Sequence, residues 1–263
     1  MKDLVILVLG AGEMASATAH RLFRCHFKLL LTEIEEPLAV RRAVSFCEAV
    51  YEGSQTVEGV TAVRIDRIED AQKIRDSGRL PILVQGPYDP PPFRPDVIID
   101  ATLRKHNFGL TMDDASMVIA LGPGFTAGND VHVVVETNRG HNLGRLIFEG
   151  TADPDTGVPG SIAGYDKERV LRSPAEGIFM SNVRLGDRVE QGQEVAEVAG
   201  KPVTSAVSGV LRGLIRPGIR VSKGMKVGDV DPRGDIGYLS TISDKARNIS
   251  GSVTEAILNR FNQ

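Results

Sequence analysis

The sequence predicts an α/β protein with a mostly parallel sheet, followed by a smaller all-β unit and a C-terminal helix. Three observations lead to this prediction: short aliphatic runs alternate with helical segments up to about residue 165, a glycine- and valine-rich stretch then repeats itself, and residues 243–261 have helical spacing. We expect an α/β domain over 1–168, a β domain over 169–234, and a helical segment over 235–263 that packs back on the α/β domain.

The α/β part begins with a buried strand, a glycine turn and a helix. Residues 4–9 are a continuous aliphatic run, and residues 13–24 have helical spacing. The spacing Gly10-x-Gly12-x-x-Ala15 between them is an allowed variant of the dinucleotide-binding fingerprint, which makes the domain Rossmann-like. The glycines let the backbone approach a phosphate at the start of the helix, where the N–H groups are free and the dipole is positive.

An acidic residue stands at the offset that this fingerprint expects. Residues 27–34 predict the second strand, and Glu33 near its end follows Gly12 by 21 residues. At a spacing of ~20 residues a carboxylate reaches a ribose hydroxyl. The alternative is a tight turn that binds nothing. Our prediction is that four residues of this unit contact a nucleotide cofactor: Gly10, Gly12, Glu13 and Glu33.

The alternation continues along the chain. The spacing predicts helices over 38–51 and 68–75, and strands over 57–65, 81–85, 96–101, 117–121, 131–137 and 145–149. A proline-rich loop, GPYDPPPFRP, follows the strand at 81–85 and cannot donate ladder hydrogen bonds at its prolines. Arg41 and Arg42 are candidates for the 2′-phosphate of NADP, although Glu33 would repel that phosphate; the alternative is surface ion pairing with Glu35 or Glu36.

A second group of candidate ligand-binding residues lies in ALGPGFTAGNDVHVVVETNRGHNLGR, residues 120–145. Glycines after a strand can wrap backbone N–H groups around an anion, and arginine grips phosphate or carboxylate with two prongs. His141 or His106 would be the proton donor if the protein is an NAD-dependent oxidoreductase. The alternative is a glycine-rich connection with surface charges. The predicted cofactor contacts in this stretch are Gly122, Gly124, Gly128, Arg139 and Arg145.

Several acidic side chains near the same strand ends could bind a hard cation. They lack a compact metal spacing, however, and helix caps, turn bonds and solvated charges explain them more simply, so we predict no metal site. The residues considered are Asp100, Asp113, Asp114, Asp130, His132 and Glu136.

Composition narrows the function classes. The formal net charge is −3, so nucleic acid is not an expected partner. Cys25 and Cys47 have no metal spacing and fit a reduced cytoplasm. We find neither a run long enough to span a membrane nor signal-peptide features, and we therefore expect a cytoplasmic protein. The pattern leaves the oligomeric state open.

The second half contains an internal repeat at an offset of 32 residues. SPAEGIFMSNVRLGDRVEQGQEVAEV at 173–198 matches SAVSGVLRGLIRPGIRVSKGMKVGDV at 205–230, and the matched residues are glycines, serines and valines. Two copies of strand, turn, strand, turn predict a quasi-two-fold β sandwich.

The phrase from Gly186 to Ala196 within this repeat resembles the biotinyl/lipoyl barrel-sandwich hybrid fold. In carrier members of that fold, a lysine at the tip between the two halves is acylated. Lys201 is the only candidate, but Pro202 follows it and the Asp-Lys-Ala or Met-Lys-Met context is missing. We therefore expect a non-carrier domain, without lipoyl or biotin attachment, that serves packing or partner docking.

The chain as a whole resembles the YqeB-type accessory proteins of the selenium-dependent molybdenum hydroxylase system. The resemblance rests on GAGEMASATAHRL, TEIEEPLAVRRAVSFCEAVYEG, DVIIDATLRK, ALGPGFTAGNDVHVVVETNRGHNLGR, the hybrid repeat and TISDKARNISGSVTEAIL. It implies a cytoplasmic protein that helps to mature a molybdenum hydroxylase by handling its cofactor or its labile selenium.

The implied partners are the hydroxylase or other maturation factors, and the expected cofactor is NAD(P) or a molybdopterin nucleotide. Two other functions stay open at this point. One is an NAD-dependent oxidoreductase, and the other is a non-catalytic scaffold that docks a client enzyme through the β domain.

Overall fold

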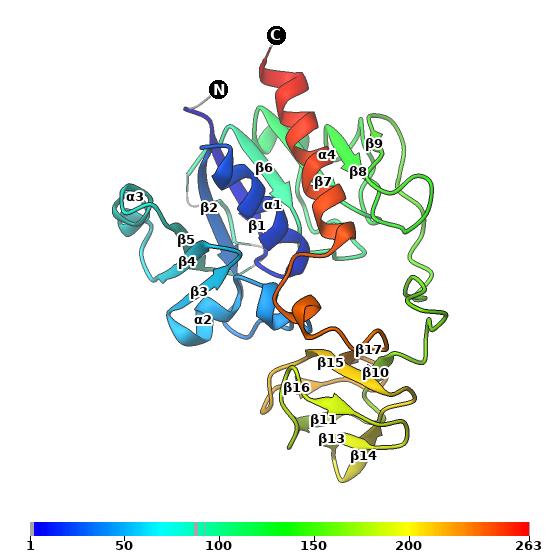
Figure 1. The fold of residues 1–263 in the computed structure, drawn as a ribbon. Helices are drawn as coiled ribbons and strands as arrows, with labels where there is room; N and C mark the ends of the chain where they lie inside the picture. Colours follow the sequence, from blue (N-terminus) through cyan, green and yellow to red (C-terminus); the bar gives the residue numbers. More distant parts are fainter. Residues whose placement is uncertain (1–2, 87–88, 92, 263) are drawn as a thin grey trace. The chain divides into compact units, whose positions relative to one another are not determined.

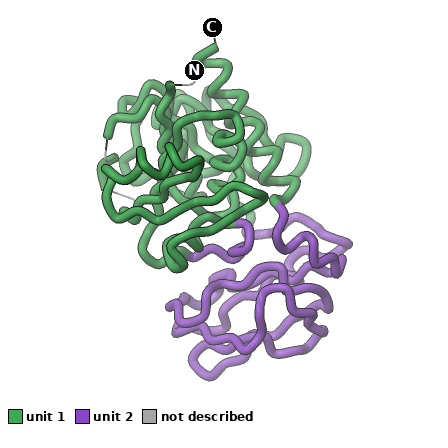
Figure 2. Tube along the Cα trace, turned by 60° about the vertical axis from the view of Figure 1, so that its left-hand side comes forward, with its two compact units in different colours: residues 1–37, 45–156, 242–263 green, residues 38–44, 157–241 purple. Residues whose placement is uncertain are grey.

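The computed structural model describes residues 3–86, 89–91 and 93–262, and it divides into two compact units. The first unit comprises residues 1–37, 45–156 and 242–263, and the second comprises 38–44 and 157–241 (Figure 2). The C-terminal helix therefore belongs to the α/β unit. The predicted domain bounds at 168/169 and 234/235 stay predictions.

The first unit contains one large sheet and four helices within the described residues. Their bounds are β1 (Val5–Leu9), α1 (Glu13–Arg24), β2 (Lys28–Glu33), α2 (Glu48–Glu52), β3 (Ser54–Val57), β4 (Val60–Ile65), α3 (Ala71–Asp76), β5 (Leu80–Val84), β6 (Val97–Asp100), β7 (Met117–Leu121), β8 (Val133–Val135), β9 (Leu146–Ile147) and α4 (Asp244–Phe261).

The sheet of the first unit has the order β3-β4-β5-β2-β1-β6-β7-β8-β9. Neighbours from β4 to β8 are parallel, whereas β3 and β9 join as antiparallel edge strands. The mostly parallel α/β sheet is thus confirmed. The central strands are buried on both faces, which explains their continuous aliphatic runs.

Helices α1 and α4 lie against each other over one face of this sheet (Figure 1), with α1 on β1 and β2 and α4 on β7 and β8. Ser243 caps α4, because its Oγ accepts a hydrogen bond from the Ala246 N–H at 3.3 Å. Val253 and Ile257 of α4 are buried, as its helical spacing predicted. On the other face, Leu7 and Ile98 belong to a core that loops after β5, β6 and β7 cover.

Two sequence predictions in this region were wrong. The helix expected over 38–51 is reduced to a 3-10 turn at Arg42–Val44 and the short α2, because 38–44 packs with the second unit: the Val40 carbonyl accepts from the Leu214 N–H at 2.8 Å. The strand expected over 57–65 is a hairpin, in which Glu58 and Gly59 have φ of 43° and 83° and turn β3 into β4.

The second unit consists of two four-stranded antiparallel sheets, β10-β17-β15-β12 and β14-β13-β11-β16. The strand bounds are β10 (Val170–Arg172), β11 (Gly177–Met180), β12 (Arg188–Val189), β13 (Glu194–Val198), β14 (Lys201–Thr204), β15 (Gly209–Leu214), β16 (Arg220–Val221) and β17 (Lys226–Asp231).

The 32-residue repeat is visible in the topology of this unit. Exchanging β10 with β14, β11 with β15, β12 with β16 and β13 with β17 converts one sheet order into the other. Hydrogen bonds repeat as well, because the Gly192 N–H donates to the Ser205 carbonyl and the Gly224 N–H to the Ser173 carbonyl, both at 2.8 Å. Assignment of the unit to the barrel-sandwich hybrid fold stays a prediction.

No helix in the described part of the chain combines the length and the apolar character needed to cross a membrane.

Candidate functional site

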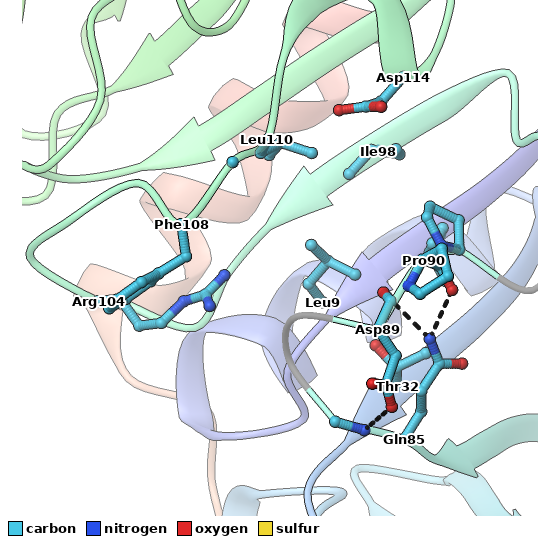
Figure 3. Close-up of a pocket in the computed structure, with 14 residues that line it drawn as sticks. Leu9, Thr32, Gln85, Asp89, Pro90, Ile98, Arg104, Phe108, Leu110 and Asp114 are labelled. Atoms are coloured by element: carbon cyan, nitrogen blue, oxygen red, sulfur yellow. Dashed lines mark hydrogen bonds between the residues drawn. The ribbon is translucent and has the colours of Figure 1, made fainter.

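A cleft in the first unit lies at the carboxyl ends of the central strands β1, β2, β5 and β6. Its cavity measures about 210 Å³, and its walls come from the ends of those strands and from the loops after β5 and β6. Leu9 forms the partly exposed apolar floor, since Leu7 and Ile98, which also border the cleft, are 0% exposed. Arg104 and Phe108 lie on one side and Asp89 and Pro90 on the other (Figure 3). Open α/β sheets bind ligands at this end.

Arg104 is held by a buried carboxylate. Asp100, the last residue of β6, is 0% exposed, and its Oδ2 accepts from Arg104 Nη2 at 2.7 Å. Thr102 completes the arrangement: its N–H and Oγ1–H donate to Asp100 Oδ1, and its Oγ1 accepts from Arg104 Nε at 2.8 Å. The guanidinium is therefore fixed on two edges while it lines the cleft.

Phe108 is the aromatic component of the cleft. It is 51% exposed, and the Arg104 guanidinium lies 5.0 Å from its ring centroid, a cation–π contact. The predicted proton donor His106 packs edge-on against the same ring with centroids 6.5 Å apart, and its own side chain is exposed. His106 therefore lies beside the cleft through Phe108 and does not line it.

The opposite rim is formed by described residues that follow β5. The Gly86 N–H donates to Asp89 Oδ2 at 2.8 Å, and Gln85 Nε2 donates to the Pro90 carbonyl at 2.9 Å (Figure 3). These bonds orient an exposed carboxylate and an amide at the mouth of the cleft, beside the apolar floor. The rim thus supplies acceptors, whereas the Arg104 side supplies donors.

The predicted glycine turn lies next to Thr102, which bonds Asp100 and Arg104, and its two glycines differ in conformation and surroundings. Gly10 has φ +91°, and a Cβ there would lie 3.4 Å from Thr102 Cα, so an L side chain would be strained. Gly12 has φ −69° and caps α1, and a Cβ there would meet nothing within 4 Å. The fold therefore requires glycine at Gly10, whereas Gly12 borders open space at the start of α1.

Glu33 points back onto the glycine turn. Its Oε2 accepts from the Ala11 N–H and its Oε1 from the Ile34 N–H, both at 2.8 Å. Burial raises the pKa of Glu33 above its usual value, against the lowering effect of these two backbone donors. The Ala11 N–H, which belongs to the glycine turn predicted to bind a phosphate, is thus already hydrogen-bonded to Glu33, the residue predicted to bind the ribose.

Glu13, in the first turn of α1, faces α4. Its Oε1 accepts from Ser243 Oγ at 2.9 Å, which links the starts of the two helices.

Gly122 and Gly124 follow β7 in positions that exclude a side chain. A Cβ at Gly122 would lie 2.6 Å from Thr137 Oγ1, and one at Gly124 would lie 2.6 Å from the Lys105 carbonyl carbon. Gly124 therefore packs against the loop that carries Arg104. Gly128 has φ +82° and its N–H donates to the Val131 carbonyl at 2.9 Å.

Arg139, His141 and Arg145 lie on the loop between β8 and β9. Arg139 makes a two-pronged ion pair with Asp244 at the start of α4, at 2.9 and 3.0 Å. His141 and Arg145 instead line a separate surface hollow together with residues of α4. The structure therefore brings Gly10, Gly12 and Glu33 together beside the cleft, and it places His141 and Arg145 at a second location.

Three of the acidic residues considered for a cation have hydrogen-bond partners of their own. Asp114 caps a 3-10 turn, Asp130 Oδ2 accepts from the Thr126 N–H, and Glu136 accepts from the N–H groups of Asn138 and Asp153. In the described ranges, no three His, Cys, Asp or Glu side chains converge on a common point. In the second unit, Lys201 is exposed directly after the turn between β13 and β14.

Arg41 and Arg42 make contacts inside the second unit. Arg41 Nη2 donates to the Tyr238 carbonyl at 2.9 Å, and Arg42 Nε donates to the Leu214 carbonyl at 2.7 Å. These backbone carbonyls are partners that the sequence analysis did not expect.

None of the predicted cofactor contacts lines the cleft itself, and Arg104 is one of the lining residues that the sequence analysis missed. The signal was available, since Asp100 ends a strand and Thr102 and Arg104 follow at offsets of two and four residues.

Comparison with known proteins identifies one similar curated sequence. It is "Uncharacterized protein YqeB" of Escherichia coli (strain K12), 43% identical over 264 residues, which covers 98% of this chain and 48% of the relative. The chain thus spans about half the length of the relative that it matches. This similarity supports the predicted resemblance to YqeB. No protein-family model matches the chain.

Solved structures match only distantly. An aspartoacylase family protein from Mesorhizobium loti is 12% identical with a TM-score of 0.28, and the product-bound ectoine utilization protein EutE (DoeB) from Ruegeria pomeroyi is 10% identical with a TM-score of 0.26. Both matches cover 87% of this chain and 85% of the other. Scores this low carry no argument about chemistry.

Proposed function

We propose that this YqeB-like chain binds a nucleotide or a nucleotide-linked cofactor in the cleft, as an accessory protein. One observation carries the proposal: a guanidinium fixed by the buried Asp100 lines a cleft that also contains the apolar side chain of Leu9, at the carboxyl ends of the central strands. A planar ring can pack on an apolar surface, and an arginine held in one orientation can donate hydrogen bonds to a phosphate or a carboxylate.

The strand order supports a nucleotide ligand. The run β5-β2-β1-β6-β7-β8 follows the order 3-2-1-4-5-6 of doubly wound dinucleotide-binding sheets. The chain leaves β1 toward β2 and β5, then returns to place β6 on the other side of β1. Ligands of open α/β sheets bind where the order reverses in this way, and the cleft is lined from both sides of that point.

Three features of the cleft and its surroundings fit three parts of a nucleotide-type ligand. Leu9 and Phe108 would contact a ring, Arg104 would bind an acidic group, and the open space outside Gly12 leaves room for a phosphate at the α1 N-terminus. The cavity of about 210 Å³ is smaller than the roughly 300–1,000 Å³ of typical ligand pockets. It would therefore enclose one part of such a ligand and leave the rest along the surface.

The wider role that we propose is maturation of a molybdenum hydroxylase of the selenium-dependent type, with a molybdopterin nucleotide as the preferred ligand. This part rests on the resemblance to YqeB-type accessory proteins, and the cleft is compatible with it because a pterin is a planar ring linked to phosphate. The partner would be the hydroxylase or another maturation factor.

Calorimetric titration with NAD, NADP, CTP, ATP and a molybdopterin nucleotide tests the binding proposal. We expect one of these to bind, and we expect Arg104→Gln to weaken it at least about tenfold through loss of a charge-assisted hydrogen bond. Arg67→Gln is the matched control, because Arg67 is an exposed arginine paired with Glu69. Absence of binding for all five compounds would reject the proposal.

Gly12→Asp provides a variant that should keep its fold. Aspartate is a favoured helix N-cap, and the added side chain meets nothing within 4 Å at its Cβ. Its charge would repel a phosphate, so the variant should remain folded and lose affinity. The maturation role is tested separately, by measuring hydroxylase activity in cells that carry wild-type protein or Gly12→Asp.

A further inference from the structure

We propose that the surface hollow lined by His141, Asn142, Arg145, Asn248 and Ser252 is a second binding site, specific for a small inorganic oxyanion such as phosphate. The hollow measures about 520 Å³ and lies in the first unit, between the β8–β9 loop and one face of α4. It shares no lining residue with the cleft, so this inference goes beyond the proposed nucleotide site.

Most of the residues that line the hollow have side chains with a hydrogen-bond donor, and the exceptions are Leu143 and Gly144. Arginine donates only, and asparagine, serine and histidine can each donate from at least one atom. No carboxylate is among the residues that line it in the described part of the chain. Within that same part, neither the Arg145 guanidinium nor the His141 imidazole has a hydrogen bond or an ion pair of its own. The hollow therefore combines positive charge with unused donors.

Two carboxylates of this region have partners that are not in the lining of the hollow. Asp244 is paired with Arg139, and both oxygens of the buried Glu136 accept backbone N–H groups. In a chain with 34 acidic and 31 basic residues, a lining without a carboxylate is a local departure from the overall charge. An anion entering the hollow therefore contacts no carboxylate among its described lining residues.

The geometry of the site is fixed at both ends of the loop. The Arg139–Asp244 ion pair attaches one end to the start of α4. At the other end, Gly144 lies so close to α4 that a Cβ would be 1.9 Å from Asn248 Oδ1 and 2.7 Å from Ser252 Oγ. Asn248 and Ser252 are four residues apart, so they share one face of the helix. The donors are thus held by two attached elements, which reduces the entropy lost on binding.

The hollow fits a small tetrahedral oxyanion better than a nucleotide. It is polar, and its lining includes no aromatic side chain besides the exposed imidazole of His141, so it offers little surface on which a base could stack. Arginine binds phosphate-type oxygens with two parallel bonds, and the Asn248 amide of α4 can add a further donor. The Ser252 hydroxyl already donates to the Asn248 carbonyl at 3.3 Å. The expected ligand is therefore free phosphate or sulfate.

Titration of the full chain with inorganic phosphate tests this inference, with AMP as a second arm that distinguishes free from organic phosphate. We expect phosphate to bind and Arg145→Ala to weaken it at least about tenfold. Asn248→Asp should have a similar effect, because it keeps the side-chain shape and places a negative charge in the hollow. Arg67→Ala is the matched control and should bind phosphate like wild type.

Gly12→Asp separates this site from the cleft. Phosphate binding that survives in Gly12→Asp and is lost in Arg145→Ala supports the inference, whether or not any nucleotide binds. Three results would overturn it: no phosphate binding to the wild type, binding that is lost in Gly12→Asp but kept in Arg145→Ala, or binding of AMP without binding of phosphate. Thermal unfolding without ligand shows which variants are folded, and Asn248→Asp provides the test if Arg145→Ala is not.

Discussion

Replacing Asp100 by asparagine tests whether the buried ion pair between Asp100 and Arg104 contributes more to stability than an exposed ion pair does. The substitution keeps the shape of the side chain and preserves one oxygen for the Thr102 N–H and hydroxyl. The substitution replaces Asp100 Oδ2, which accepts from Arg104 Nη2 at 2.7 Å, by an NH₂ group. Two donor groups then face each other, and this hydrogen bond is lost.

The magnitude follows from this lost bond. A hydrogen bond to a charged group contributes roughly 1.5–3 kcal/mol, and Asp100 is 0% exposed, so water does not replace the missing partner. We expect Asp100→Asn to lower the free energy of unfolding by about 2 kcal/mol. Ligand affinity should fall as well, because the guanidinium that lines the cleft loses its anchor.

Asp66→Asn is the matched control. Asp66 pairs with Arg64 at 3.0 Å, a similar contact, but its side chain is 77% exposed. Exposed ion pairs contribute about 0–1 kcal/mol, so this variant should stay close to wild type. Urea unfolding of the three proteins at low and high salt measures the difference. Equal effects of the two substitutions, or loss of the Asp100 effect in high salt, would refute the argument for a buried, solvent-shielded anchor.

Three further predictions concern the fold around the site. Gly124→Ala should destabilise the chain by about 1–3 kcal/mol more than Gly140→Ala in urea unfolding, because both have positive φ but only Gly124 has backbone at 2.6 Å from the new methyl group. Burial lowers the pKa of His132 below its usual value of 6.5, so His132 takes up a proton more readily in the unfolded chain than in the folded one. The free energy of unfolding should therefore fall as pH decreases below 6.5. In a pH series of urea unfolding, His132→Gln should lack this part of the pH dependence. Ser243→Ala removes the α4 cap and the bond to Glu13, and it should cost about 1 kcal/mol in the same assay, whereas no change would show that the cap contributes nothing.

Elements that depend on local sequence were predictable. The helix Glu13–Arg24 and the strand Met117–Leu121 match their predicted bounds, because aliphatic runs and helical spacing are read within one element. The repeat at 32 residues likewise predicted the equivalence of strands in the second unit. The segment 38–44 was predicted wrongly because its partner, β15, is about 170 residues away, and a helical pattern does not reveal such a contact.

The candidate site was predictable only in part, for a similar reason. The glycine turn and Glu33 were found from spacing, and the structure places them side by side through the Ala11 N–H. Arg104 was missed because its position depends on Asp100 and on the Gly124 loop that packs against its own loop. Glycine-rich sequence by itself does not distinguish close backbone packing from ligand contact.

Mapping a bound nucleotide by amide chemical shifts would test the central claim most directly. The account predicts that the largest shifts, on addition of the compound that binds in calorimetry, lie in residues 10–14, 85–86 and 98–110, around the cleft and the glycine turn. Shifts confined to the β8–β9 loop, to the second unit or to the opposite ends of the strands would contradict it. In that case the cleft would not be the nucleotide site, and Arg104 would be part of the fold alone.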